Sequence, residues 1–117
     1  MTAARADDFL ASLAKMGIAS PAQRETLADH TLEVCRIVAA KWLKLKQLRI
    51  DDMDDVVQEA AIRAMGRIAL WDPARAAWRT YVAVVARSAV GERRRQYARD
   101  ARFVPLPDDL EDLEGQT

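Results

Sequence analysis

Apolar residues recur every three or four positions along most of this chain, the spacing that places them on one face of an α-helix. No β-branched run alternates with polar residues over enough positions to predict a strand. Glycine and proline, which interrupt helices, occur only four times each in 117 residues. The sequence therefore predicts an all-α protein, a small bundle of about four helices around a single core.

The first two helices have clear boundary signals. A short helix is expected over residues 7–15, and Gly17 ends it. A long helix is expected over residues 20–48, because Ser20-Pro21-Ala22-Gln23 supplies an N-cap, a proline at the first helical position and the glutamine of a capping box. The residues predicted to face the core are Phe9, Leu10, Leu13 and Met16 in the first helix, and Leu27, Thr31, Val34, Val38, Trp42 and Leu45 in the second.

Two more helices are predicted in the second half of the chain. The third begins near Asp51 or Asp52, whose carboxylates favour the positive end of a helix, and runs to about Leu70. The turn Trp71-Asp72-Pro73 follows, because proline disfavours helical geometry in the residue before it. Asp72 is a good N-cap for the helix that comes next. The fourth helix covers 78–99. We divide the chain into a short N-terminal helix at 1–19, a helical domain at 20–102 and an acidic tail, expected to be flexible, at 103–117.

The third helix has two contrasting faces. Its predicted core stripe consists of Val57, Ala61, Ala64, Ile68 and Trp71. The opposite face carries Asp55, Gln58, Glu59, Ile62 and Gly66. A solvated helix with one stray isoleucine fits this pattern, since single exposed apolar residues are normal. A docking surface fits it too, with an apolar contact ringed by carboxylates. Residues 51–59 contain five acids and no base, so such a partner would be positively charged.

Positive charge is concentrated in the fourth predicted helix. Residues 75–102 contain eight arginines and two acidic residues, a local net charge of +6 in a chain whose 18 basic and 18 acidic residues cancel. Such a cluster is typical of nucleic-acid binding, although the arginines at 93–95 also suit a solvated helix end. Trp78 and Tyr81 either pack in the bundle or stack on unpaired bases, and packing is favoured for Trp78 because of its inward position. Trp78, Val82, Val85 and Ala89 are predicted to face inward, and Val84, Arg87, Ser88, Gly91, Arg94 and Arg95 outward.

Several other functional classes have no candidate residues in this sequence. The single cysteine, Cys35, favours a reducing, cytoplasmic setting, and His30 has no companions at metal-ligand spacing and is interpreted as structural. No catalytic constellation or cofactor site can be assembled, so we expect a protein that is not an enzyme. No apolar run approaches the length of a membrane span.

Residues 51–102 contain three distinctive motifs, at 54–60, 71–75 and 78–81. On these motifs, residues 51–102 resemble region 2 of bacterial sigma factors, in the form found in the extracytoplasmic-function group, and residues 20–48 resemble the preceding helix more weakly. The run Asp54-Asp55-Val56-Val57-Gln58-Glu59-Ala60 is similar to the family's Asp-hydrophobic-hydrophobic-Gln-Glu signature. Trp71-Asp72-Pro73-Ala74-Arg75 resembles its aromatic-Asp-Pro-x-Arg turn, and Trp78-Arg79-Thr80-Tyr81 resembles the start of its strand-opening helix.

This resemblance implies two binding surfaces. The third helix would bind core RNA polymerase, at the clamp helices of its largest subunit, through Asp55, Gln58 and Glu59, with Ile62 as the apolar contact. The fourth helix would contact promoter DNA at the minus-ten element through Arg79, Tyr81, Arg87, Ser88, Arg94 and Arg95. The acidic tail either solubilises the chain, occupies a basic channel of the polymerase, or folds back on the arginines.

Three departures from the family pattern shape the expected function. Val84 and Val85 stand where housekeeping sigma factors have a tryptophan pair, and Ser88 and Gly91 replace the usual polar recognition residues. No helix-turn-helix for the minus-thirty-five element follows residue 102. We therefore expect a split sigma factor that acts with a separate DNA-binding activator protein. A polymerase-binding regulator or decoy, and a purely structural or adaptor module, remain as alternatives.

Overall fold

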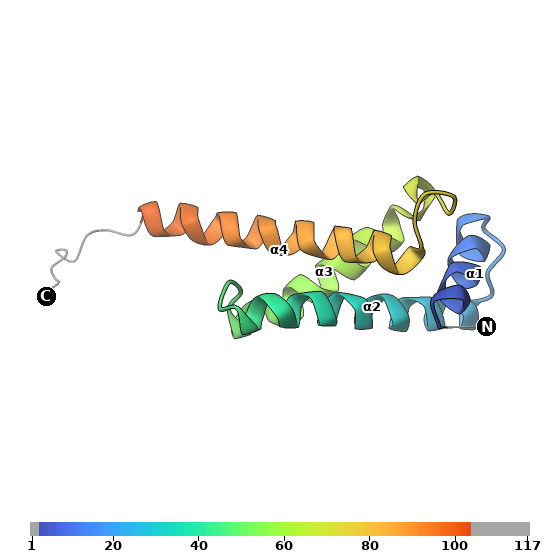
Figure 1. The fold of residues 1–117 in the computed structure, drawn as a ribbon, viewed down its shortest axis with the longest axis horizontal. Coiled ribbons are helices and arrows are strands. Elements are labelled where there is room, and N and C mark those ends of the chain that lie inside the picture. Colours follow the sequence, from blue (N-terminus) through green and yellow to red (C-terminus); the bar gives the residue numbers. More distant parts are fainter. Residues whose placement is uncertain (1–2, 104–117) are drawn as a thin grey trace, which may run out of the picture.

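The computed structural model describes residues 3–103, and all regular structure in this part of the chain is helical (Figure 1). The four α-helices are α1 (Ala3–Lys15), α2 (Pro21–Lys44), α3 (Met53–Gly66) and α4 (Trp78–Phe103). Single turns of 3-10 helix stand on either side of α3, namely η1 (Ile50–Asp52) and η2 (Ile68–Leu70). The predicted all-α bundle of about four helices is confirmed. The predicted tail, apart from Phe103, lies outside the described residues.

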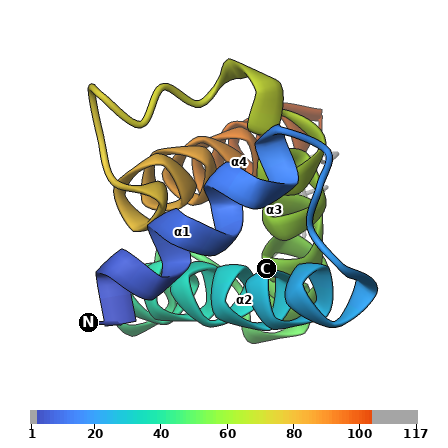
Figure 2. The same cartoon turned by 90° about the vertical axis from the view of Figure 1, so that its right-hand side faces the viewer.

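Three helices form the body of the bundle, and α1 closes one end of it. In Figure 1, α2 and α4 run in the same direction and α3 crosses between them. Each of these three helices contacts the other two. Figure 2 shows α1 lying across the end where α2 and α4 begin, and it contacts both helices as well as η2. The first residues of α2 and α4 are therefore held together by α1.

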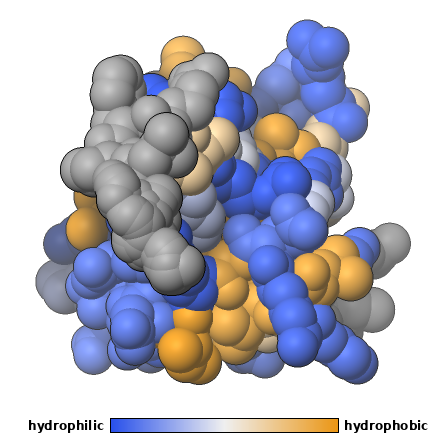
Figure 3. All heavy atoms as spheres, turned by 90° about the vertical axis from the view of Figure 1, so that its left-hand side faces the viewer, coloured by the Kyte–Doolittle hydropathy of each residue, from blue (hydrophilic) through white to orange (hydrophobic). Residues whose placement is uncertain are grey.

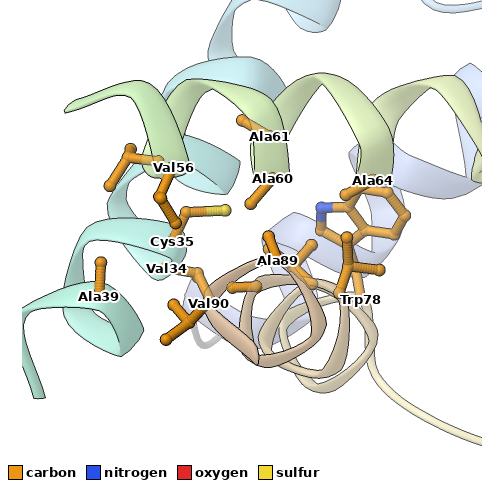
Figure 4. Packing of buried hydrophobic residues seen from close by; sticks show 14 of the residues in the cluster. Val34, Cys35, Ala39, Val56, Ala60, Ala61, Ala64, Trp78, Ala89 and Val90 are labelled. Atoms are coloured by element: carbon orange, nitrogen blue, oxygen red, sulfur yellow. The ribbon is translucent and has the colours of Figure 1, made fainter. Parts of the chain in front are cut away.

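Small side chains allow α3 to approach α2 and α4 closely. Ala60 and Ala64 of α3 are fully buried, and Ala89 of α4 lies opposite them in the core (Figure 4). Val34 and Cys35 complete this layer from α2. Adding methylene groups to so tightly packed a layer would cost about 1–3 kcal/mol through overpacking. The alanines thus fix the spacing of the three helices.

The predicted C-terminal end of the first helix and the predicted N-terminal end of the second are confirmed by their capping contacts. The backbone N–H of Gln23 donates to Ser20 Oγ at 3.1 Å, and the backbone N–H of Ser20 donates to Gln23 Oε1 at 2.8 Å, so the capping box is complete. Gly17 ends α1 with a positive φ of 76°. Its N–H bonds to the Ala14 carbonyl and that of Ile18 to the Leu13 carbonyl. This reversal turns the chain from α1 into α2.

The predicted core stripe of α1 is wrong in part. Phe9 and Met16 are 54% and 63% exposed, whereas Asp7 and Ala11 are buried. Hydrogen bonds explain this difference. Asp7 accepts from the Arg79 side chain and Asp8 from the Trp78 backbone N–H, so the side of α1 that carries these carboxylates faces inward. Hydrophobic periodicity alone does not identify a face that is buried through its carboxylates.

Other expectations about helix ends also need correction. The first helix begins at Ala3 instead of Asp7, and the fourth continues to Phe103 instead of Arg99. The second helix ends at Lys44 instead of Leu48, so Leu45 is 55% exposed while Cys35 and Ala39 are buried. The third helix ends at Gly66, and Trp71 reaches the core from the connection that follows η2. The tighter turn η2 takes the place of the expected last turn of the helix, and Trp71 directly after it is buried.

Two glycine-to-alanine substitutions are predicted to have opposite effects on stability. Gly17→Ala places a Cβ in left-handed backbone and should destabilise the fold by about 1–2 kcal/mol. Gly91→Ala, in the middle of α4, should stabilise it by about 0.5–1 kcal/mol, since the new Cβ meets only Arg95 Nη1, at 3.5 Å. Urea unfolding at constant m-value measures both. A change in the free energy of unfolding of the same sign in both variants would contradict this description of α1 and α4.

Candidate functional site

The acidic face of α3, defined as Asp55, Gln58, Glu59 and Ile62, is exposed as predicted. Ile62 is 71% exposed, and Val56, Val57, Ala60 and Ala61 are buried on the opposite side. Asp54 and Asp55 lie in the first turn, where carboxylates are favourable to the helix dipole. The face therefore combines an apolar side chain with negative charge on one rigid helix.

An apolar groove runs beside the acidic face, between α3 and α2. Its volume is about 670 Å³. The α3 wall includes Gln58, Ile62 and Met65, so two residues of the acidic face also border the groove. From α2 the groove is lined by Arg24, Glu25, Ala28, Leu32 and Arg36. A partner helix lying here would bury apolar surface beside the carboxylates of α3.

Sequence reasoning missed the contribution of α2 to this surface. Arg24, Ala28, Leu32 and Arg36 repeat every four residues, which is a helix-face signal that was available in the sequence. Only the placement of α2 beside α3 turns this second stripe into the wall of a groove.

An ion-pair network fixes α3 against α4 next to the acidic face. Arg63 binds Glu92 through both guanidinium nitrogens, each at 2.9 Å, and Glu59 at 2.9 Å. The hydrogen bonds from Arg63 hold the pKa of Glu92 below its ordinary value and raise the pKa of Arg63 itself. Arg93 reaches from α4 to Asp52 at 3.0 Å. Glu59 is thus exposed but already paired, whereas no ion pair is formed by Asp55 within residues 3–103.

The arginine face of α4, defined as Arg87, Ser88, Arg94 and Arg95, is also exposed as predicted. Val84, at the same side of the helix, is 50% exposed. Arg87, Arg94 and Arg95 form no ion pair with any residue of the described part of the chain. Their positive charges are therefore available to an external anion.

Two other sequence-predicted DNA contacts are held by bonds inside the fold. Arg79 Nη1 is 3.2 Å from Asp7 Oδ2 of α1. Tyr81 stacks on Trp78, with 5.5 Å between ring centroids and an interplanar angle of 28°, and its hydroxyl donates to the Arg67 carbonyl. Both side chains are half-buried as a result. Arg79 and Tyr81 are therefore less accessible to a nucleotide than Arg87, Arg94 and Arg95.

The start of α4 is capped from α1 and not from the preceding turn. The backbone N–H of Trp78 donates to Asp8 Oδ1 at 2.7 Å. Asp72, expected to cap the next helix, instead accepts from the Ala74 N–H at 3.0 Å within its own turn. Asp8, which lies 70 positions earlier in the sequence, therefore accepts the hydrogen bond from the first backbone N–H of α4.

Asp7 is buried at the junction of three helices, and sequence reasoning did not single it out. Its side chain is 1% exposed and lies between Arg79 of α4 and His30 of α2, with which it pairs. His30 is structural in this position, as expected. Trp78 is buried, as expected, and Cys35 is buried with its pKa raised to about 11 by desolvation, so its thiol is protonated at neutral pH.

One family model matches the chain. The model for sigma-70 region 2 covers residues 36–100, which run from the middle of α2 to near the end of α4. The chain belongs to the sigma-70 region 2 family. No curated protein and no solved structure gave a match in the other two comparisons. Sigma-70 region 2 has a role in RNA polymerase binding and promoter recognition, and it is a non-enzymatic domain of transcription factors.

No group of three or more histidine, cysteine, aspartate and glutamate side chains within residues 3–103 is arranged to hold a metal ion. The same residues include no helix with the length and hydropathy that a membrane crossing requires.

Removing the charge of Asp7 is predicted to destabilise the bundle. Asp7→Asn keeps the shape of the side chain and one acceptor oxygen, but it removes the negative charge that pairs with His30 and Arg79, so each contact is weakened from a charge-assisted to a neutral hydrogen bond. We expect a loss of about 1–3 kcal/mol in the free energy of unfolding, measured in urea. Asp29→Asn, at an exposed position of α2, is the matched control and should change little. Equal stability of the two variants would contradict the structural role of Asp7.

Proposed function

We propose that this chain acts as a split sigma factor, which binds core RNA polymerase through α3 and minus-ten promoter DNA through α4. A separate DNA-binding activator protein supplies the remaining promoter contact. The observation that carries this proposal is the pair of exposed surfaces on one rigid bundle: the acidic face of α3 with its groove, and the arginine face of α4.

The polymerase-binding part is supported by the chemistry of the acidic face. Ile62 and the groove offer apolar area, and Asp55 offers a carboxylate that has no ion-pair partner among the described residues. A basic, helical protein surface such as the clamp helices of the largest polymerase subunit matches both features. Gln58 stands where the two features meet.

The DNA-binding part is supported by the arginine face and by Gly91. Arg87 and Arg94 are seven residues apart and so lie on the same side of α4, close enough to follow one phosphate backbone. Gly91 lies between them, and the space at its missing Cβ is open except for the Arg95 side chain. A DNA backbone or a displaced base can therefore approach the helix closely.

Few side chains of α4 remain free to contact DNA, and this supports the need for a second DNA-binding protein. Arg79 and Tyr81 are occupied by contacts within the bundle, and Arg93 is paired with Asp52. At the positions of the family's tryptophan pair, Val84 is half exposed and Val85 is buried. This leaves a small set of phosphate contacts and no large aromatic wedge, so the DNA affinity of the chain alone should be low.

Alanine at the acidic face should weaken polymerase binding. Replacing Asp55, Gln58 and Glu59 together removes carboxylates and an amide at the centre of the proposed interface, and we expect a loss of at least about tenfold in affinity for core polymerase, measured by surface-immobilised binding. The control is the double variant Asp29→Ala, Glu33→Ala, which removes the same two charges from an exposed side of α2. If the control weakens binding as much, net charge and not this face is responsible.

Alanine at the arginine face should reduce the salt dependence of DNA binding. Each of Arg94→Ala and Arg95→Ala removes one phosphate contact, so the slope of log K against log salt should fall by about one unit per variant. Arg36→Ala, an exposed arginine on α2, carries the same charge change and should leave the slope unchanged. An unchanged slope in the α4 variants would argue against DNA contact by these residues.

Transcription in vitro separates a split sigma factor from a decoy. Co-purification from the native cell identifies the activator, and the reconstituted reaction then contains core polymerase, this chain, the activator and its promoter. A split sigma factor gives transcripts only when both proteins are present. A decoy gives none and lowers transcription by a competing sigma factor, which would overturn the proposal.

A further inference from the structure

A basic pocket lies where the end of α2 meets the C-terminal half of α4. Its volume is about 530 Å³, and every charged residue in its lining is a cation: Lys46, Arg49 and Arg94. Leu43, Ile50 and Tyr97 provide apolar walls. Figure 3, which faces this end of the molecule, shows hydrophobic surface bordered by hydrophilic residues. The pocket combines three positive charges with apolar area.

The charged walls of this pocket are held in place without being neutralised. The Arg49 guanidinium carbon lies 4.2 Å from the centroid of the Tyr97 ring, and the Arg49 backbone N–H donates to the Tyr97 hydroxyl at 3.2 Å. The Arg94 guanidinium carbon lies 5.1 Å from the centroid of the Trp42 ring. Cation-π contacts orient a guanidinium and leave its charge intact. Within residues 3–103, no carboxylate forms an ion pair with Lys46, Arg49 or Arg94.

A ligand for such a pocket must be both anionic and apolar, and one segment of this chain has that chemistry. Residues 104–117, outside the described part, contain five acids and no base. Leu106, Leu110 and Leu113 are interspersed among these acids, so the segment carries both carboxylates and large apolar side chains. A pocket of three cations and three apolar walls is complementary to this pattern in both charge and hydrophobicity.

The segment is also long enough to reach the pocket. Arg94 precedes the end of α4 at Phe103 by nine residues, or about 14 Å along the helix axis. Fourteen residues after Phe103 span at most about 50 Å when extended. A segment tethered this closely has an effective concentration in the millimolar range, so modest contacts suffice for binding.

We propose that residues 104–117 bind in cis to the basic pocket. The leucines contact Leu43, Ile50 and Tyr97, and the carboxylates pair with Lys46, Arg49 and Arg94. Because Arg94 belongs to the arginine face, the bound segment competes with DNA phosphates for it. This consequence for DNA rests on the proposed function, whereas the docking itself does not.

A spin label near the end of the chain tests the docking directly. Gln116→Cys can be labelled selectively in the full chain at neutral pH, because Cys35 is buried and its pKa is raised to about 11. In NMR spectra we expect the label to broaden the backbone amide signals of residues 46–50. The matched control carries Leu106→Ser, Leu110→Ser and Leu113→Ser, which keeps all five acids, and in it the broadening should be lost. Equal broadening in both chains, or broadening confined to the end of α4, overturns the proposal.

Two further measurements complete the test. In a mixture of labelled chains without isotope and isotope-enriched chains without label, broadening at residues 46–50 would show binding between molecules and overturn the cis assignment. Lys46→Asn removes a pocket charge at a residue whose φ is 59°, a conformation that asparagine tolerates, and should weaken the broadening in the labelled chain. Unchanged broadening in this variant counts against the pocket.

The effect on DNA is measured separately with unlabelled protein. The triple serine variant should bind a DNA duplex several-fold more tightly than the parent chain, and its unchanged net charge rules out a general electrostatic cause. If the labelled parent chain shows docking but the triple serine variant binds DNA no more tightly than the parent, the docking is supported and the DNA contact proposed for Arg94 is contradicted. A failure of docking with DNA binding retained overturns this inference and leaves the proposed function standing.

Discussion

The indole of Trp78 is the contact on which the arrangement of the bundle depends. Its Nε1–H donates to Thr31 Oγ1 of α2 at 3.0 Å, and both residues are almost completely buried. Trp71 meets its ring edge to face at 5.4 Å, and Tyr81 stacks on it. Because Asp8 of α1 caps its backbone N–H, this first residue of α4 is joined to α1, to α2 and to the connection after η2. A buried aromatic ring with a satisfied polar group is worth several kcal/mol in such a position.

This junction fixes the direction in which α4 leaves the bundle, and so it fixes the two surfaces relative to each other. At the other side, the Glu59, Arg63 and Glu92 network joins the middle of α3 to the middle of α4. These pairs are exposed and contribute little to stability individually, about 0–1 kcal/mol each, but their bidentate geometry restricts sliding of one helix along the other. The proposed polymerase and DNA surfaces are therefore carried on one rigid frame.

Much of this arrangement was predictable from local sequence, and the rest depended on contacts between distant residues. The capping box at Ser20 and Gln23 and the inward positions Trp78, Val82, Val85 and Ala89 follow from short-range rules, which is why those predictions were confirmed. The exposure of Gln58 and Ile62 followed from helical periodicity in the same way.

The burial of Asp7 was not predictable, because its partner Arg79 stands 72 residues away and an aspartate near a helix start usually faces solvent. The groove beside Ile62 also required the placement of α2 against α3, which no single helix pattern contains. The early end of α3 has a local signal in Gly66, but helical periodicity also places this residue on the acidic side of the helix, so the sequence alone does not decide between a helix end and a helix face.

The proposed function requires the acidic face of α3 to lie against the polymerase in the complex. A photo-crosslinking amino acid placed at the position of Gln58 and, in a second chain, at exposed Ala40 of α2 measures this contact. With core polymerase present, position 58 should crosslink to the largest subunit and position 40 should not. A crosslink from position 40 with none from position 58 would show that another side of the bundle faces the polymerase.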